Sequence, residues 1–172
     1  LLPASVKMLS SKGIQIMAQQ GLGESVFVPD SAYADSGAQI KPRSEILASA
    51  DIVARLSKPS PQDLEAMKNG CIHISYLDPF NETDLLVRMA SQGLSTISLE
   101  MIPRTTLAQK MDVLSSQASL AGYYAVILAA ERIAKVFPMM MTPAGTIPPA
   151  RVFIVGAGVA GLQAIATAKR LG

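Results

Sequence analysis

The chain of 172 residues alternates short apolar runs with segments of helical pattern, and this alternation most constrains its fold. Apolar runs typical of strands cover residues 14–17, 51–57, 71–76 and 94–99. Strands that are separated by helices of about ten residues pair in parallel through right-handed crossovers. The pattern therefore predicts an α/β fold with parallel sheet.

Residues that start and end helices support this prediction. Ser60 is followed three residues later by Asp63, with a proline between them, which is the pattern of a capping box. Asn81 with Asp84 marks another helix start, and Gly13 stands where a helix-ending glycine belongs. The predicted helices cover residues 3–12, 30–33, 42–49, 61–70 and 81–92.

The pattern changes after residue 110. Residues 111–136 contain no proline, and as a helix rising about 1.5 Å per residue they would span about 40 Å. Residues 137–150 contain four prolines, which is typical of a hinge, whereas residues 151–155 predict a new strand and 159–171 a new helix. We therefore expect an N-terminal α/β domain at residues 1–110, a connecting helix with its hinge at 111–150, and the start of an incomplete second domain at 151–172. On this interpretation the chain is cut from a longer protein.

Composition excludes several classes of function. Fifteen Lys and Arg against 13 Asp and Glu give a net charge of +2, too small for a nucleic-acid footprint. A single cysteine, Cys71, excludes a disulfide scaffold, and a single histidine, His73, excludes multi-histidine metal centres, so no metal site is predicted. The longest apolar stretch, residues 121–130, is short of the roughly 20 residues of a membrane span. Because no secretory leader pattern is present, we expect a cytoplasmic location.

The strongest chemical signal is a Gly-x-Gly-x-x-Gly pattern formed by Gly156, Gly158 and Gly161. It follows an apolar strand pattern and opens a helical one, the context in which this motif binds a dinucleotide. The first glycine permits the turn, the second admits a pyrophosphate, and the third allows close helix packing. The N–H groups of Val159 and Ala160 would then face the phosphates. Glycines that serve packing alone are the alternative, and NAD and NADP both stay open, because the ribose-binding acid would follow residue 172.

A second group of polar residues follows the last strand pattern of the first domain. Gln109, Asp112 and Ser115 step by three, so a helical or turn conformation places them toward one side, with Arg104 just before them. Such an edge of a parallel sheet is where α/β folds bind ligands. The alternative is structural, with Arg104 as a solvated charge and Asp112 or Thr106 as the cap of the long helix.

A set of short segments, dense after residue 101, forms a recognisable pattern: Pro103–Arg104, Ala108–Gln109, Met111–Asp112, Leu114–Gln117, Ala121–Tyr123, Phe137–Thr142, Ala144–Thr146, Pro148–Arg151 and Gly156–Gly172. With them the chain resembles the NAD(H)-binding alpha subunit of the proton-translocating NAD(P) transhydrogenases, in the alanine dehydrogenase/transhydrogenase family. The resemblance extends more loosely back to Leu2.

This resemblance implies a role for individual residues. Gln109 helps to join two nicotinamides, while Arg104, Asp112 and Ser115 fix the carboxamide, so the hydride-transfer (catalytic) residues are Gln109, Asp112 and Arg104. The implied coenzyme-binding residues are Arg104, Thr105, Thr106, Leu107, Gln109, Lys110, Met111, Asp112, Ser115, Gly156, Gly158, Val159, Ala160 and Gly161.

The resemblance also implies an activity and an assembly. Hydride passes from NADH to NADP⁺, which a separate domain binds, and a membrane domain couples the exchange to proton movement. The implied protein is a homodimer on the cytoplasmic face of the inner membrane, without insertion into the membrane. Its two Rossmann-like parallel-sheet domains are joined by a long helix, the first lacking its first strand and the second truncated after its first βα unit.

Two alternatives stay open. An alanine dehydrogenase needs a lysine to bind its substrate and a histidine for proton transfer, but the corresponding positions hold Ser57 and Asp78, and Lys58 is one residue displaced. An inactive fragment is the second alternative. The sequence further predicts that His73 and Cys71 lie in the core and that the methionines at 139–141 form a packed hinge.

Overall fold

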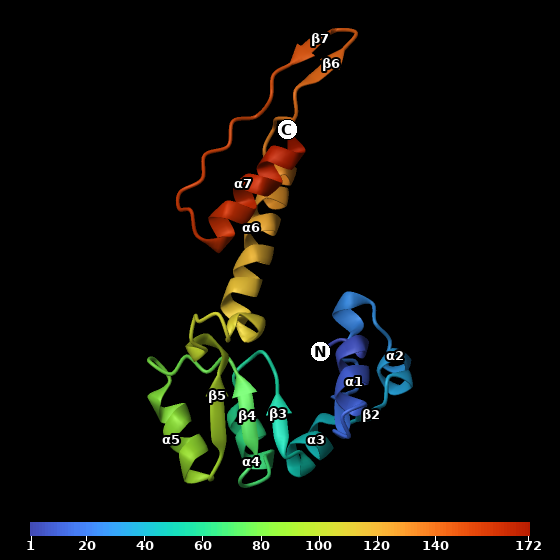
Figure 1. Ribbon diagram of the computed structural model, residues 1–172, viewed down its shortest axis with the longest axis vertical. Helices are drawn as coiled ribbons and strands as arrows, with labels where there is room; N and C mark the ends of the chain where they lie inside the picture. Colours follow the sequence, from blue (N-terminus) through green and yellow to red (C-terminus); the bar gives the residue numbers. More distant parts are fainter. The chain divides into compact units, whose positions relative to one another are not determined.

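The structure, a computed structural model, describes residues 1–172 and divides into two compact units, Leu1–Met101 and Ile102–Gly172. Figure 1 labels their helices and strands. The first unit alternates helix and strand as predicted, and the α/β fold class is confirmed. Its elements are α1 (Pro3–Ser10), β1 (Ile16–Gln19), η1 (Glu24–Val26), α2 (Asp30–Asp35), β2 (Ala38–Lys41), α3 (Arg43–Ser49), β3 (Ile52–Ala54), α4 (Pro61–Ala66), β4 (Ile72–Ser75), α5 (Thr83–Ser91), β5 (Ser95–Ser98) and η2 (Leu99–Met101).

All strands of the first unit pair in parallel, in two separate sheets. The strand β1 pairs with β2, with Ile16 opposite Ala38. The strand β4 is the centre of the sheet β3–β4–β5, where Ile72 lies between Ile52 and Ser95. The sequence analysis missed β2, because only four residues lie between a glycine and a proline, too few for a visible alternation.

Helix boundaries in the first unit agree with the predictions in part. Ser60 Oγ accepts a hydrogen bond from the Asp63 N–H at 3.2 Å, and Asp63 accepts one from the Ser60 N–H at 3.0 Å, so the capping box of α4 is confirmed. The helix ends at Ala66, before the predicted Gly70. The prediction that Asn81 starts α5 is wrong, because its side chain donates to Asp78 at 2.9 Å and the residue at the N-cap is Glu82.

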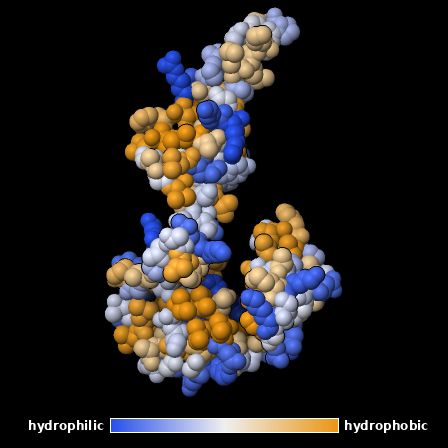
Figure 2. Space-filling view, in the orientation of Figure 1, coloured by the Kyte–Doolittle hydropathy of each residue, from blue (hydrophilic) through white to orange (hydrophobic).

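The helices α3, α4 and α5 supply the core on one face of the sheet β3–β4–β5. Leu47, Leu64 and Met89 pack there in one cluster with Val53 from the sheet. The opposite face is apolar and open, since Ile52 is 57% exposed and Ile97 46% exposed. Figure 2 shows hydrophobic surface over these strands. Parallel sheets are usually buried on both faces, so an open apolar face is unusual.

The second unit begins with a loop and the short helix η3 (Gln109–Met111), which lead into α6 (Val113–Arg132). The segment predicted as a hinge contains an antiparallel hairpin, β6 (Met140–Thr142) with β7 (Gly145–Ile147). The prediction that the methionines at 139–141 form a packed hinge is wrong, because Met139 and Met141 are exposed. The predicted strand at residues 151–155 is also not formed, because this segment pairs with no other strand. The helix α7 (Val159–Leu171) has the predicted bounds.

The helices α6 and α7 pack against each other, as Figure 1 shows. Val126 of α6 forms a core cluster with Ala164 and Ala168 of α7. Gly122, one turn before Val126, is buried against the first turn of α7, where an added Cβ would lie 2.2 Å from the carbonyl oxygen of Ala160. Small residues on both helices therefore allow their backbones to approach closely at this end.

The long helix differs from the sequence expectation in one further respect. By length and composition alone, α6 could cross a membrane, and 11% of its apolar window is buried. The helix is longer than the apolar stretch 121–130 on which the sequence expectation of no membrane span rests, because it extends on both sides of that stretch, and this finding does not test that expectation. These two measures also fit helices of soluble proteins.

Candidate functional site

The glycine turn between residues 155 and 159 has the geometry that its sequence predicts. Gly156 has a φ of 98°, in the left-handed region that favours glycine. A Cβ on Gly161 would lie 2.1 Å from the carbonyl oxygen of Gly156, so only glycine lets the first turn of α7 lie against this turn. The third glycine thus serves close packing, against the turn's own backbone.

The N-terminus of α7 is open to a ligand. Gly158 is the N-cap residue, no side chain caps the helix, and a Cβ on Gly158 would meet nothing within 4 Å. The Leu162 N–H bonds to the Gly158 carbonyl at 2.9 Å, but the preceding N–H groups, including those of Val159 and Ala160, have no partner within a helix. Unpaired N–H groups and the helix dipole favour an anion here.

The loop before α6 displays its side chains to solvent. Ala108 is its one buried residue, whereas Leu107 is 91% exposed. The Ala108 N–H donates to the Thr105 carbonyl at 3.0 Å, which closes a tight turn. The exposed side chains of the loop are those of Arg104, Thr105, Thr106, Leu107, Gln109, Lys110 and Met111. An exposed apolar residue among polar ones has no structural role in the loop itself.

Asp112 caps α6, as the structural alternative predicted. Its carboxylate accepts hydrogen bonds from the Ser115 N–H at 2.9 Å and the Ser115 hydroxyl at 2.7 Å. These two bonds, with the nearby Arg104 charge as a smaller cause, hold the pKa of Asp112 below its ordinary value. Thr106 does not cap the helix. The structure therefore brings Asp112 and Ser115 into contact, whereas Arg104 is near enough only for its charge to act on Asp112, and Gln109 lies in η3 just before them.

The loop and the glycine turn lie at different levels along α6. Gly122, which contacts the start of α7, is ten residues after Asp112 in the chain. At about 1.5 Å per residue, these two points are about 15 Å apart along the helix. A ligand that touches both sets of residues must therefore be elongated.

The edge of the sheet where β3 and β4 end holds a different set of polar contacts. The Lys58 ammonium is paired with the Glu82 carboxylate. Asp78 has a φ of 52°, and the N–H groups of Leu77 and Asp78 donate to the Glu100 carboxylate. Because Glu82 already pairs with Lys58, the charge of Lys58 is compensated within the protein.

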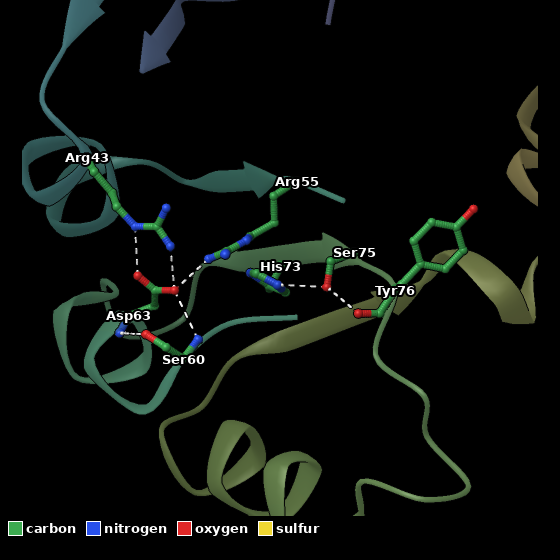
Figure 3. Close-up of polar contacts among 7 residues, drawn as sticks. All are labelled: Arg43, Arg55, Ser60, Asp63, His73, Ser75 and Tyr76. Carbon is green, nitrogen blue, oxygen red and sulfur yellow. Dashed lines mark hydrogen bonds and ion pairs between the residues drawn. The ribbon is translucent and has the colours of Figure 1, made fainter. Parts of the chain in front are cut away.

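A partly buried set of polar contacts beside the sheet β3–β4–β5 was not predicted from the sequence (Figure 3). Asp63 accepts from Arg43 at 2.8 and 2.6 Å and from Arg55 at 2.7 Å, and these bonds, that of Arg43 first, hold its pKa well below the ordinary range. The Ser75 hydroxyl donates to the Tyr76 carbonyl, so it accepts from His73 Nε2–H at 3.1 Å. The only sequence signal was Asp63 itself, as a capping acid, because its two arginines come from other elements.

The prediction that His73 and Cys71 are core residues is confirmed, since they are 0% and 1% exposed. The Nδ1 atom of His73 has no hydrogen-bond partner. Burial, and then the Arg55 charge, lower the pKa of His73 to about 4. His73 is therefore neutral at physiological pH and enclosed, which does not suit a proton-transfer group for a substrate.

Comparison with known proteins identifies the family. A family model described as "Alanine dehydrogenase/PNT, N-terminal domain" matches residues 1–121, and "Alanine dehydrogenase/PNT, C-terminal domain" matches residues 125–172. The chain belongs to the alanine dehydrogenase/PNT family. The division of this family match falls within α6, at residues 122–124.

Members of the alanine dehydrogenase/PNT family differ in their similarity to this chain. An NAD(P) transhydrogenase alpha-subunit protein of Rhodospirillum rubrum is 40% identical over 99% of this chain and 46% of its own length. The crystal structure of transhydrogenase from Sinorhizobium meliloti has a TM-score of 0.96 and 45% identity over 99% of this chain and 51% of that one. An alanine dehydrogenase of Methanococcus maripaludis is 25% identical over 99% of this chain and 46% of its own. The chain thus spans about half the length of these relatives.

Proposed function

We propose that this chain is the NAD(H)-binding component of an NAD(P) transhydrogenase, which transfers hydride from NADH to NADP⁺. The observation that carries the proposal is the uncapped N-terminus of α7, with open space at Gly158. This end of the helix suits the pyrophosphate of a dinucleotide, because its free N–H groups and the helix dipole attract phosphates and no side chain at Gly158 blocks them. When bound, the coenzyme supplies the hydride.

The residues of the loop would orient the nicotinamide end. The exposed Gln109 and Arg104 side chains carry amide and guanidinium donors that suit a carboxamide. The Asp112 carboxylate binds the hydroxyl and the amide of Ser115 at the start of α6. Asp112 therefore fixes the end of the loop, in addition to any contact that it makes with the ligand. Direct hydride transfer depends on orientation and on exclusion of water, and a neutral, buried His73 is not required for it.

The second candidate, an alanine dehydrogenase, is disfavoured by the structure of the first unit. The positions that would bind and protonate its substrate are Ser57 and Asp78, and the nearby Lys58 is paired with Glu82. The higher identity to the transhydrogenase relative agrees with this choice.

The assembly belongs to the same proposal. We infer a homodimer, peripheral on the cytoplasmic face of the inner membrane, with NADP(H) bound by a separate domain and proton translocation performed by a membrane domain. We also infer a division into an N-terminal domain at residues 1–110, a connector at 111–150 and the start of the nucleotide-binding domain at 151–172. The transhydrogenase relatives carry the name of an alpha subunit, which supports the presence of further subunits. Sedimentation of the full-length protein tests the dimer.

The activity is tested with the full-length protein and its NADP(H)-binding partner. Hydride transfer from NADH to an NADP⁺ analogue is followed by absorbance, in the unmodified protein and in Gln109→Ala. We expect about a 100-fold loss of rate in this variant, because a misplaced nicotinamide costs about that factor. Gln117→Ala, on the exposed surface of α6, is the matched control and should keep the rate. Alanine-dependent reduction of NAD⁺ by the unmodified protein would instead support the second candidate.

Residues 1–172 alone should bind NADH weakly or not at all. The extended segment 151–155, which leads into the glycine turn, pairs with no strand, and Phe153 and Val155 are almost fully exposed. The turn therefore lacks the neighbouring strands that normally fix it in a dinucleotide-binding sheet. Titration of this chain with NADH by calorimetry checks the expectation, and micromolar affinity would contradict it.

A further inference from the structure

At Gly122 the helix α6 lies directly against the backbone of the first turn of α7. A Cβ at this position would lie 2.2 Å from the Ala160 carbonyl oxygen and 2.9 Å from its carbonyl carbon. Both are backbone atoms, so no side-chain rotation could make room. A glycine in a helix interior lowers helix stability, and here the close approach of a second backbone explains its presence.

This contact joins α6 to the end of α7 at which the candidate phosphate site lies. Ala160 is the second residue of α7, in the first turn of the helix, whose N-cap residue Gly158 has no side-chain cap. About 15 Å away along α6 lies Asp112, which fixes the end of the Arg104–Gln109 loop. The length of α6 between Asp112 and Gly122 therefore fixes the distance between the loop and the glycine turn. Gly122 determines the position along α6 at which the glycine turn packs.

We propose that Gly122 is a positioning residue that sets the separation between the glycine turn and the loop, so that one dinucleotide can reach both. This inference rests on the proposed function. Gly122 itself touches no ligand. It acts through the backbone of Ala160, which its missing side chain allows to lie against α6.

The effect of one added methyl group follows from the contact distance. A Cβ is not found closer than 3.0 Å to such an atom, so Gly122→Ala must move the start of α7 by about 0.8 Å. Such a shift leaves each half of the site intact but spoils their spacing. A ligand that occupies both halves gains affinity from their linkage, and this gain falls when the spacing of the halves no longer matches the ligand. A ligand that occupies one half has no such linkage to lose.

The experiment compares three ligands in the full-length protein. NADH spans both halves, ADP carries the pyrophosphate without the nicotinamide ribose, and reduced nicotinamide riboside carries the nicotinamide and its ribose without a phosphate. In Gly122→Ala we expect the affinity for NADH to fall by about 10- to 100-fold, while the affinity for each half-ligand changes by less than about threefold. Ala121→Ser is the matched control, because it adds one heavy atom at the exposed neighbouring position. It should leave all three affinities unchanged.

The other outcomes separate the two proposals. If the unmodified protein binds none of the three ligands, the proposed function fails. If it binds them and Gly122→Ala retains NADH affinity, or loses NADH and the half-ligands equally, the positioning role is refuted. Should Gly122→Ala not fold, Ala164→Val adds two methyl carbons to the same helix contact one turn farther from the glycine turn, where Ala164 packs with Val126. The same selective loss for NADH, of smaller size, is then expected, and an equal effect on all three ligands refutes the role.

Discussion

Replacing His73 by glutamine should remove an acid-dependent loss of stability from the first unit. The imidazole is fully buried, its Nε2–H is donated to the Ser75 hydroxyl, and its Nδ1 has no partner. A proton added to Nδ1 would create an uncompensated charge beside the Arg55 guanidinium, whose partner Asp63 already accepts four hydrogen bonds. Glutamine can donate its amide N–H to Ser75 and does not titrate.

The magnitude follows from the shifted pKa. The pKa of His73 falls from 6.5 to about 4 in the folded protein, so the unfolded chain takes up the proton first as the pH falls. The stability from this group is therefore complete above pH 6.5, declines as the pH falls toward 4, and is lost below 4. Linkage gives a loss of about 2 kcal/mol between pH 7.5 and pH 5 for such a shift, and about 3 kcal/mol in all.

Hydrogen exchange of peptides that cover β4 measures this effect locally, because the two units need not unfold together. The free energy of opening is measured at pH 7.5 and pH 5 in the unmodified protein and in His73→Gln, with intrinsic exchange rates taken into account. Carboxylates contribute equally to the two proteins, so the difference between them isolates His73. If both proteins lose the same free energy within about 0.5 kcal/mol, the account of a neutral, enclosed imidazole is refuted.

Three further outcomes are expected. Asp63→Ala should lower the free energy of unfolding by about 3 kcal/mol, because Arg55 keeps a largely buried charge without a partner. The control Glu45→Ala breaks an exposed pair with Lys41 and should lower the free energy of unfolding by less than about 0.5 kcal/mol. Equal urea midpoints for the two variants would contradict this prediction. Asp112→Ala should cost about 1 kcal/mol through loss of the helix cap, in addition to its effect on hydride transfer, and a melting curve that does not change would exclude the capping role. Gly161→Ala should abolish binding of ADP-ribose to the full-length protein, because its Cβ would overlap the Gly156 carbonyl, whereas retained binding would show that the turn can relax.

Local sequence signals predicted the elements that depend on neighbouring residues. The bounds of α7 and the capping box at Ser60 agree with the structure, because a helix and its cap are decided within a few residues. The left-handed conformation of Gly156 likewise follows from the glycine pattern itself. Apart from β2, the order of strands and α-helices in the first unit was also readable from the alternation of patterns.

Features that depend on distant residues were not predictable in this way. The segment 151–155 has the composition of a strand, but a strand also requires a neighbour to pair with. The arginines that hold Asp63 come from α3 and from the end of β3, and no spacing in the sequence joins them. Gly122 is a glycine inside a long helix, and the reason for it lies in Ala160, far along the chain. For the candidate site, the sequence offered Asp112 as a ligand contact or as a helix cap, and only the structure shows that its carboxylate holds both the amide and the hydroxyl of Ser115.

That engagement sets two demands on a single carboxylate. It must keep both bonds to Ser115 for the first turn of α6 to stay ordered, and it can accept a donor from a bound molecule only through the lone pairs that Ser115 leaves free. A ligand that approaches along those directions adds a bond without loosening the helix, whereas one that displaces Ser115 gives up helix stability for its own contact.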